Sequence, residues 1–294
     1  MVADVRLDSV QPWKEYPGLQ VQGAYYGLIQ NSYFGKRNGH QKDILNYING
    51  SYSRVPNRTA RDGTPIRRIV VTGHSLGGGL AQVTHLCLTA PGSDAFGDLA
   101  DAIRRREVQV KSVAFAAPMT TALVDPGPKA KQFLRDHIRP HMRNFCYKTD
   151  PVPRGYANVE FILDLLDDIK KKFLAAKTEE DNKMIVKLSG FLKEGLLPWA
   201  LGFLGDTAEA VLEQAKRYRH VGRVIHYREE HAPPQIYQDD EEEDEERGAA
   251  AAFCGLAYTP SREDPIRDAL YCHSYLVAEK GLGYRSAPGM QTVL

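Results

Sequence analysis

The sequence lacks the features that assign a chain to several common protein classes. Its four cysteines, at positions 87, 146, 254 and 272, form no Cys-x-x-Cys pair, which argues against a zinc site. There is no run of about 18 apolar residues, and the N-terminus has no basic start followed by an apolar stretch. We therefore expect no transmembrane segment, no signal peptide and, for the chain as given, a cytoplasmic location.

The balance of charge argues against a nucleic-acid-binding protein. The 38 Lys and Arg residues and the 37 Asp and Glu residues give a formal net charge of +1, so bulk electrostatics do not favour nucleic-acid binding. The 294 residues are 43% hydrophobic, which suits a single domain over residues 1–294 with a full core. Cys87 and Cys146 lie in apolar runs and are interpreted as buried thiols, while two disulfides stay open for a secreted protein. The oligomeric state is left open.

Strand-like and helix-like segments alternate along the first half of the chain. Buried strands are expected at Arg67–Thr72, Val108–Ala116 and Arg143–Lys148, and an apolar helix at Leu76–Leu88 follows the first of them. Strand character returns at Val221–Tyr227. This order predicts an α/β fold, with a mostly parallel central sheet and helices on both of its faces.

Two segments interrupt this order. Residues 158–218 repeat apolar residues at helical spacing and are predicted to be a helical insertion. Their apolar stretch GLLPWALGFLG, residues 195–205, is interpreted either as part of a packed subdomain or as a lid that contacts a lipid surface. Residues 236–250 contain eight consecutive acids, Asp239–Glu246, and are predicted to be a disordered acidic loop.

One motif combines chemistry with the right structural context. Gly73-His74-Ser75-Leu76-Gly77 has the form Gly-x-Ser-x-Gly and falls between a predicted buried strand and a predicted helix. A serine at such a turn projects its hydroxyl at the carboxyl edge of the sheet. The backbone N–H of Leu76, at the start of the helix, is a candidate oxyanion donor. The two glycines are expected to leave room for backbone that a Cβ would crowd.

A nucleophilic serine needs a base and an acid, which follow it in chain order as acid and then histidine on this kind of fold. Asp150 directly follows a predicted strand and is favoured as the acid, with Asp125 as the competitor in a turn. The histidines that follow both are left as candidate bases: His220, His226, His231 and His273.

Four segments together resemble the class 3, fungal-type lipases of the α/β-hydrolase superfamily. The most specific is Gly73–Ala81, which is close to the family's GHSLGGALA. Val21–Tyr25, the Asp-Pro-Val-Pro at Asp150–Pro153 and the Tyr-x-His-Val-Gly at Tyr218–Gly222 are similar to further family segments. Gln22 stands where the family has a histidine.

The resemblance implies a catalytic triad of Ser75, Asp150 and His273, with His273 in Cys-His-Ser-Tyr before the last helix. It implies that His220 is structural, that no cofactor or metal is needed, and that the substrate is a lipid ester. It also implies that a first strand, whose FRGT-like end supplies a second oxyanion donor, is missing before Met1. The alternative function is a catalytically weak, lipase-like interaction or signalling protein.

Overall fold

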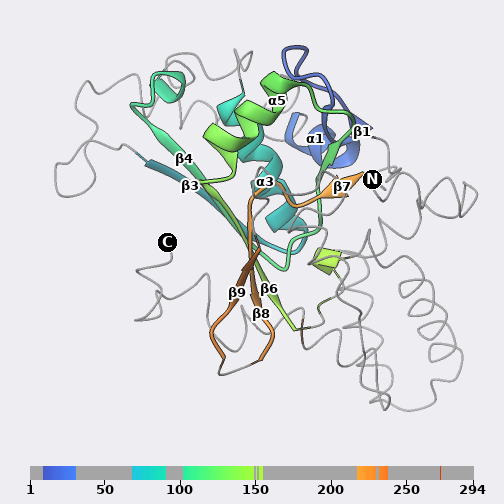
Figure 1. Ribbon diagram of the computed structural model, residues 1–294, viewed down its shortest axis with the longest axis vertical. Helices are drawn as coiled ribbons and strands as arrows, with labels where there is room; N and C mark the ends of the chain where they lie inside the picture. Colours follow the sequence, from blue (N-terminus) through green and yellow to red (C-terminus); the bar gives the residue numbers. More distant parts are fainter. Residues whose placement is uncertain are drawn as a thin grey trace, which may run out of the picture.

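The computed structural model describes residues 9–30, 68–90, 102–148, 150, 152–154, 217–229, 232–237 and 272. These residues form two β-sheets, with helices packed between them (Figure 1). The single-domain organisation over residues 1–294 stays a prediction.

The larger sheet carries the strands that the sequence predicted. Its order is β3 (Arg68–His74), β4 (Gln109–Phe115), β6 (Met142–Tyr147), β8 (Arg223–Tyr227) and β9 (Gln235–Tyr237). The first four are parallel neighbours, and β9 pairs antiparallel with β8. The predicted α/β-hydrolase type of fold, with a mostly parallel central sheet, is confirmed.

The smaller sheet was largely unpredicted. It is antiparallel, in the order β1 (Ser9–Val10), β2 (Leu19–Gln22), β5 (Thr121–Leu123) and β7 (Tyr218–Arg219). Strands of two to four residues leave too short a pattern to recognise, and their pairing depends on partners that are distant in sequence.

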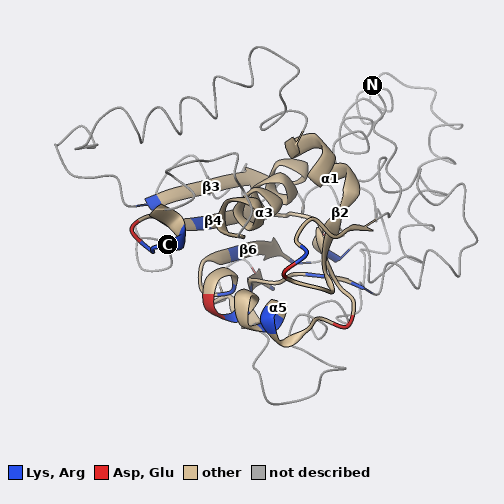
Figure 2. Cartoon of the chain, turned by 90° about the horizontal axis from the view of Figure 1, so that it is seen from above, with Lys and Arg blue, Asp and Glu red and all other residues tan. Residues whose placement is uncertain are grey.

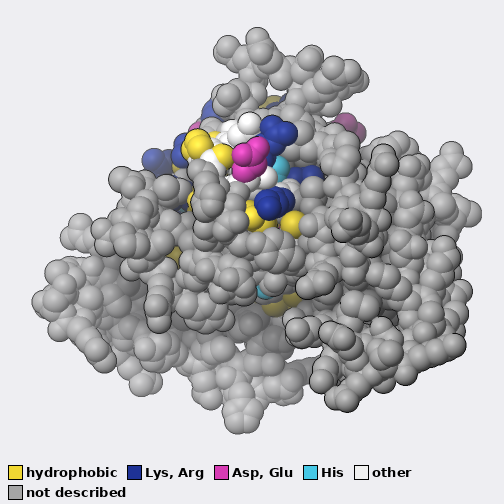
Figure 3. Space-filling view, turned by 90° about the horizontal axis from the view of Figure 1, so that it is seen from below, with side chains coloured by type: hydrophobic (Ala, Val, Ile, Leu, Met, Phe, Trp, Pro, Cys, Tyr) yellow, Lys and Arg dark blue, Asp and Glu magenta, His cyan; other side chains and the backbone are white. Residues whose placement is uncertain are grey.

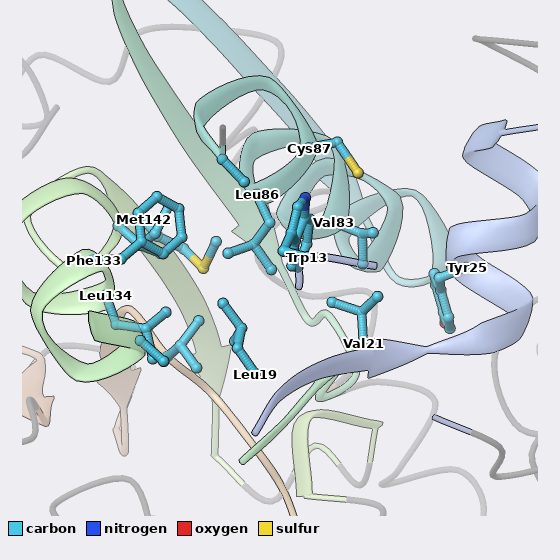
Figure 4. Packing of buried hydrophobic residues seen from close by; sticks show 14 of the residues in the cluster. Trp13, Leu19, Val21, Tyr25, Val83, Leu86, Cys87, Phe133, Leu134 and Met142 are labelled. Atoms are coloured by element: carbon cyan, nitrogen blue, oxygen red, sulfur yellow. The ribbon is translucent and has the colours of Figure 1, made fainter. Parts of the chain in front are cut away.

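One face of the larger sheet is covered by described helices. The helices α1 (Gly23–Leu28), α3 (Leu76–Thr89) and α5 (Pro128–Phe133), with η3 (Leu134–Ile138), bury their apolar residues in one core cluster. Figure 4 shows that Val83 and Leu86 of α3 point into this cluster beside Leu19 and Val21 of β2. The cluster joins the smaller sheet to the larger one and fixes the position of α3.

The opposite face holds a second apolar cluster. Phe115, Phe145, Tyr147 and Ile225 come from β4, β6 and β8, and Cys272 packs against them with only 1% of its surface exposed. Of the residues after Tyr237, Cys272 is the one that the structure describes. Cys272 therefore lies beside the carboxyl half of the central strands.

Basic side chains line the amino ends of the central strands. Lys111 is the register partner of Val70 on β3, and Arg143 is the partner of Val113 on β4 and of Arg223 on β8. Burial and the charges of Arg68 and Arg143 lower the pKa of Lys111. Figure 2 shows Lys and Arg at the starts of β3, β4 and β6. At about 3.3 Å per residue, Arg68 lies about 20 Å along β3 from its carboxyl end, so this basic row is remote from Ser75.

Several expectations fall outside the described residues. Residues 158–216 of the predicted helical insertion are not described. Tyr218, which was predicted as the last residue of the insertion, is the first residue of β7. The predicted acidic loop starts later than residue 236, because β9 extends to Tyr237, and the rest of it is not described. Cys87, Cys146 and Cys272 are buried thiols, which confirms the interpretation of the first two. Within the described ranges no helix is long and apolar enough to cross a membrane.

Candidate active site

Ser75 occupies a strained turn between β3 and α3. Its backbone angles are φ 54° and ψ −123°, a conformation that L-residues other than glycine seldom adopt. Its N–H donates to the Phe115 carbonyl at 2.9 Å, and its carbonyl accepts from the Gly79 N–H at 3.1 Å. The neighbouring strand and the first turn of α3 thus hold the serine in the strained geometry of a nucleophile elbow.

The Ser75 hydroxyl is nearly enclosed. The residue is 5% exposed, and Oγ makes no hydrogen bond to any residue that the structure describes. Leu76 is the first residue of α3, where a backbone N–H has no acceptor within the helix. An N–H at this position lies at the positive end of the helix dipole and is suited to an oxyanion.

The two glycines of the motif differ in what they require. A Cβ at Gly73 would lie 2.2 Å from the Gly77 carbonyl oxygen, so Gly73 is needed for the close approach of strand and helix. A Cβ at Gly77 would meet no atom of the described residues within 4 Å apart from the backbone of its own helix, so the expectation that it too would crowd a neighbouring backbone is wrong. The tight contacts occur instead at the next two glycines. A Cβ added to Gly78 would lie 2.7 Å from the Ala117 Cβ, and a Cβ added to Gly79 would lie 2.5 Å from the Tyr25 ring.

We expect Gly73→Ala and Gly77→Ala to have opposite effects on stability. Gly73→Ala forces strand and helix apart and should lower the free energy of unfolding by about 1–3 kcal/mol. Gly77→Ala places a better helix former in the first turn of α3 and should leave stability unchanged or raise it by up to about 1 kcal/mol. Denaturant unfolding of both variants measures this, and equal losses would contradict the geometry at Gly77.

Asp150 lies just beyond β6 and is 1% exposed. Its N–H donates to the Tyr147 carbonyl at 3.0 Å, and its Oδ1 accepts from the Val152 N–H at 3.0 Å. Because β4 alone separates β3 from β6, the ends of these two strands are about 10 Å apart. An imidazole between Ser75 and Asp150 can span that gap.

Asp125 does not share this edge. It follows β5 of the smaller sheet and has a positive φ of 46°, in a turn where the Val124 N–H donates to the Gly18 carbonyl. The sequence predicted a turn for this Val-Asp-Pro-Gly-Pro segment. The turn follows a strand of the smaller sheet, whereas β3 and β6 belong to the larger sheet.

Two of the candidate histidines have described surroundings. His220 is 1% exposed, with Nε2 3.0 Å from the Pro153 carbonyl oxygen. His226 is 2% exposed, with Nε2 2.8 Å from the Lys148 carbonyl oxygen. Both rings therefore contact backbone of the segment around Asp150. His231 and His273 lie outside the described residues, although Cys272, which precedes His273, packs in the cluster of Phe115 and Tyr147.

Sequence reasoning missed a buried polar network beneath the elbow. Gln82 Nε2 donates to Asn144 Oδ1 at 2.7 Å, and Thr120 Oγ1 donates to Gln82 Oε1 at 3.0 Å, with all three residues buried. The network ties α3 to β6 and so links the element that begins at Ser75 to the strand that precedes Asp150. The signal in the sequence was a lone glutamine within an apolar helix.

A second contact between a serine and a histidine is structural. His85 Nδ1 lies 2.9 Å from Ser112 Oγ, and both residues are fully buried between α3 and β4. Burial, and next the charge of His141, lower the pKa of His85 to about 3. A neutral, enclosed pair in mid-strand offers a substrate no access.

In the described part of the chain, no group of three or more His, Cys, Asp or Glu side chains is arranged to hold a metal ion.

Residues 40–159 match the family described as "Lipase (class 3)", and the matched span includes both Ser75 and Asp150. This match spans 120 of the 294 residues and supports the resemblance to the class 3 lipases. No curated protein is significantly similar in sequence.

Three solved lipases are similar to this chain at low sequence identity. The lipase from Rhizopus microsporus var. chinensis is 14% identical with a TM-score of 0.41, over 89% of this chain and 56% of that one. Lipase II from Rhizopus niveus is 13% identical with a TM-score of 0.37, over 80% and 55%. The M37 lipase is 15% identical with a TM-score of 0.45, over 95% and 62%. The chain thus covers less than two thirds of the length of each of these lipases.

Proposed function

We propose that this protein hydrolyses carboxylic esters of lipids, as a class 3 lipase would, with Ser75 as its nucleophile. The observation that carries the proposal is the strained conformation of Ser75 in a strand–helix turn within the class 3 lipase match. Strain at a single buried serine is maintained when the chemistry requires that geometry. The buried Asp150, on the same edge of the sheet, supports the proposal independently.

The proposed reaction uses three side chains and one backbone donor. Ser75 Oγ attacks the ester carbonyl carbon while its proton passes to the imidazole of His273, and the Leu76 N–H donates to the oxyanion. The tetrahedral intermediate collapses, the ester C–O bond breaks, and His273 returns the proton to the leaving alcohol. Water then attacks the acyl-enzyme by the same route, which releases the fatty acid and restores Ser75. Asp150 holds the imidazole in the tautomer that accepts the proton.

The substrate class follows from the family and is tested directly. Wild-type protein should hydrolyse an emulsified triacylglycerol, a monoacylglycerol or a phospholipid, as well as a short activated ester, and a pH-stat assay of released fatty acid measures this. Contact with the lipid surface would show as a rise in rate once the substrate exceeds its solubility. Hydrolysis of none of these esters would favour the alternative function, a lipase-like interaction protein.

We expect Asp150→Asn to lower kcat by roughly 10⁴, since the amide stabilises the wrong imidazole tautomer while the fold is kept. Asp125→Asn is the matched control and should leave kcat close to that of the wild type, because Asp125 lies in a turn of the smaller sheet. Steady-state kinetics on the short ester measure both variants. The reverse order of effects would move the acid to the loop after β5.

A further inference from the structure

We propose that Arg154 and His226 are positioning residues, which hold the Lys148 carbonyl and through it fix Asp150 for catalysis. This inference rests on the proposed function, because it gives the pair a role in the same reaction. It assigns a role to two buried polar side chains that the mechanism does not otherwise use.

The backbone at Lys148 needs support. Its φ of 40° lies in the left-handed region, which is unfavourable for a residue with a Cβ and persists only when the surroundings enforce it. The turn at Lys148 brings the chain from β6 to Asp150, whose N–H then donates to the Tyr147 carbonyl. If Lys148 relaxed to an ordinary conformation, Asp150 would move with it.

Lys148 is held from both sides of its backbone. Its N–H donates to the Tyr227 carbonyl of β8 at 2.7 Å. Its carbonyl oxygen accepts from Arg154 Nη2 and lies 2.8 Å from His226 Nε2. A carbonyl oxygen has two lone pairs, so it can accept from the guanidinium and the imidazole together. Arg154 Nη2 and His226 Nε2 lie 3.0 Å apart, and we interpret them as two donors that share the Lys148 carbonyl oxygen as their acceptor.

The pair is built into the core. Arg154 is 3% exposed and His226 is 2% exposed, and they come from η4 (Val152–Arg154) and from β8. Burial lowers the pKa of His226 to about 4, with the Lys148 carbonyl opposing and Arg154 reinforcing the effect. The ring is therefore neutral near pH 7 and keeps one N–H, which Nε2 can direct at the carbonyl.

The contact closes a short loop around the acid. Arg154 reaches back to Lys148, and within that span Asp150 Oδ1 accepts from the Val152 N–H. The reaction assigns the other oxygen, Oδ2, to the imidazole of the base. The two donors on Lys148 thus set the direction in which Oδ2 points, at a site where a displacement of about 1 Å can cost roughly 100-fold in rate.

The test compares variants of the full chain by kcat and KM on a short activated ester. His226→Leu and Arg154→Met each remove one donor and should lower kcat roughly 10- to 100-fold with KM unchanged. His226→Gln restores an N–H donor near the Nε2 position and should recover most of the lost kcat. In the Asp150→Asn background, His226→Leu should cause little further loss, because it acts through that carboxylate.

His85→Leu is the matched control for buried histidines. It removes a fully buried ring whose partner is Ser112, away from the loop of Asp150, so it should lower the melting temperature without lowering kcat at a temperature where the variant is folded. A wild-type kcat in folded His226→Leu and Arg154→Met would overturn the inference, and so would a full, additive loss in the Asp150→Asn background. If wild-type protein and Ser75→Ala hydrolyse the ester equally, the proposed function itself fails, and the inference with it.

Discussion

Replacement of Ser75 by Ala is expected to lower kcat by about 10⁶ and to abolish covalent labelling by a fluorophosphonate probe. The loss is expected to be large because Oγ is the atom that we propose bonds to the acyl group. Stability should fall little, since Oγ has no hydrogen-bond partner in the described part of the chain and Ala has the same Cβ. Gel fluorescence after labelling and hydrolysis of an activated ester measure the two effects.

Ser112→Ala is the matched control for this experiment. Ser112 also contacts a histidine, but it is fully buried in β4 and offers no access to a substrate. Labelling should therefore survive in Ser112→Ala. Equal labelling of wild type and Ser75→Ala would remove Ser75 from the mechanism, whereas an unlabelled wild type would favour the interaction-protein alternative.

The second large effect is expected at His273, where substitution by Ala should lower kcat by about 10⁶, as loss of the base does in a serine triad. The choice of His273 comes from the family resemblance and gains support from its neighbour. Cys272 packs against the cluster that contains Phe115 and Tyr147. The Phe115 carbonyl accepts from the Ser75 N–H, and the Tyr147 carbonyl accepts from the Asp150 N–H.

His220→Ala is the comparison for the base. The Nε2 atom of His220 lies 3.0 Å from the Pro153 carbonyl oxygen in the core, so its removal should lower stability and leave most of kcat in the folded fraction. Thermal melting and steady-state kinetics on both variants separate the two roles. Loss of activity in folded His220→Ala, with His273→Ala active, would assign the base to His220.

In the view from below, basic, acidic and hydrophobic side chains of the described residues lie side by side in one area of the surface (Figure 3). Ile236 of β9 is a large apolar side chain that is 63% exposed.

The central strands and α3 could be predicted because their signal is local. Buried parallel strands need continuous runs of β-branched and apolar residues, and β3, β4 and β6 have them. The elbow was recognisable for the same reason, because strand, Gly-x-Ser-x-Gly and helix are contiguous. The smaller sheet has no such signal, since β5 and β7 are stabilised mainly by pairing with each other and with β2.

The choice of acid shows where local reasoning needed the fold. Asp150 and Asp125 both follow a strand and both stand before a proline. Strand order separates them, because β6 lies in the same sheet as β3 while β5 lies in the other sheet. The contacts that hold the loop of Asp150 could not be predicted from the sequence for the same reason. Arg154 and His226 are 72 residues apart and come into contact only because β8 pairs with β6.

The sequence by itself indicated the resemblance to the class 3 lipases, the parallel α/β core and the serine at the elbow, because each depends on residues that are adjacent in the chain. Only the tertiary structure decided that Ser75 is held in a strained conformation by a carbonyl of β4, that Gly73 and not Gly77 is sterically required, and which groups hold the loop of Asp150. These are contacts between segments brought together by the sheet. Their geometry depends on strand order and register, which a linear pattern of residue types does not specify.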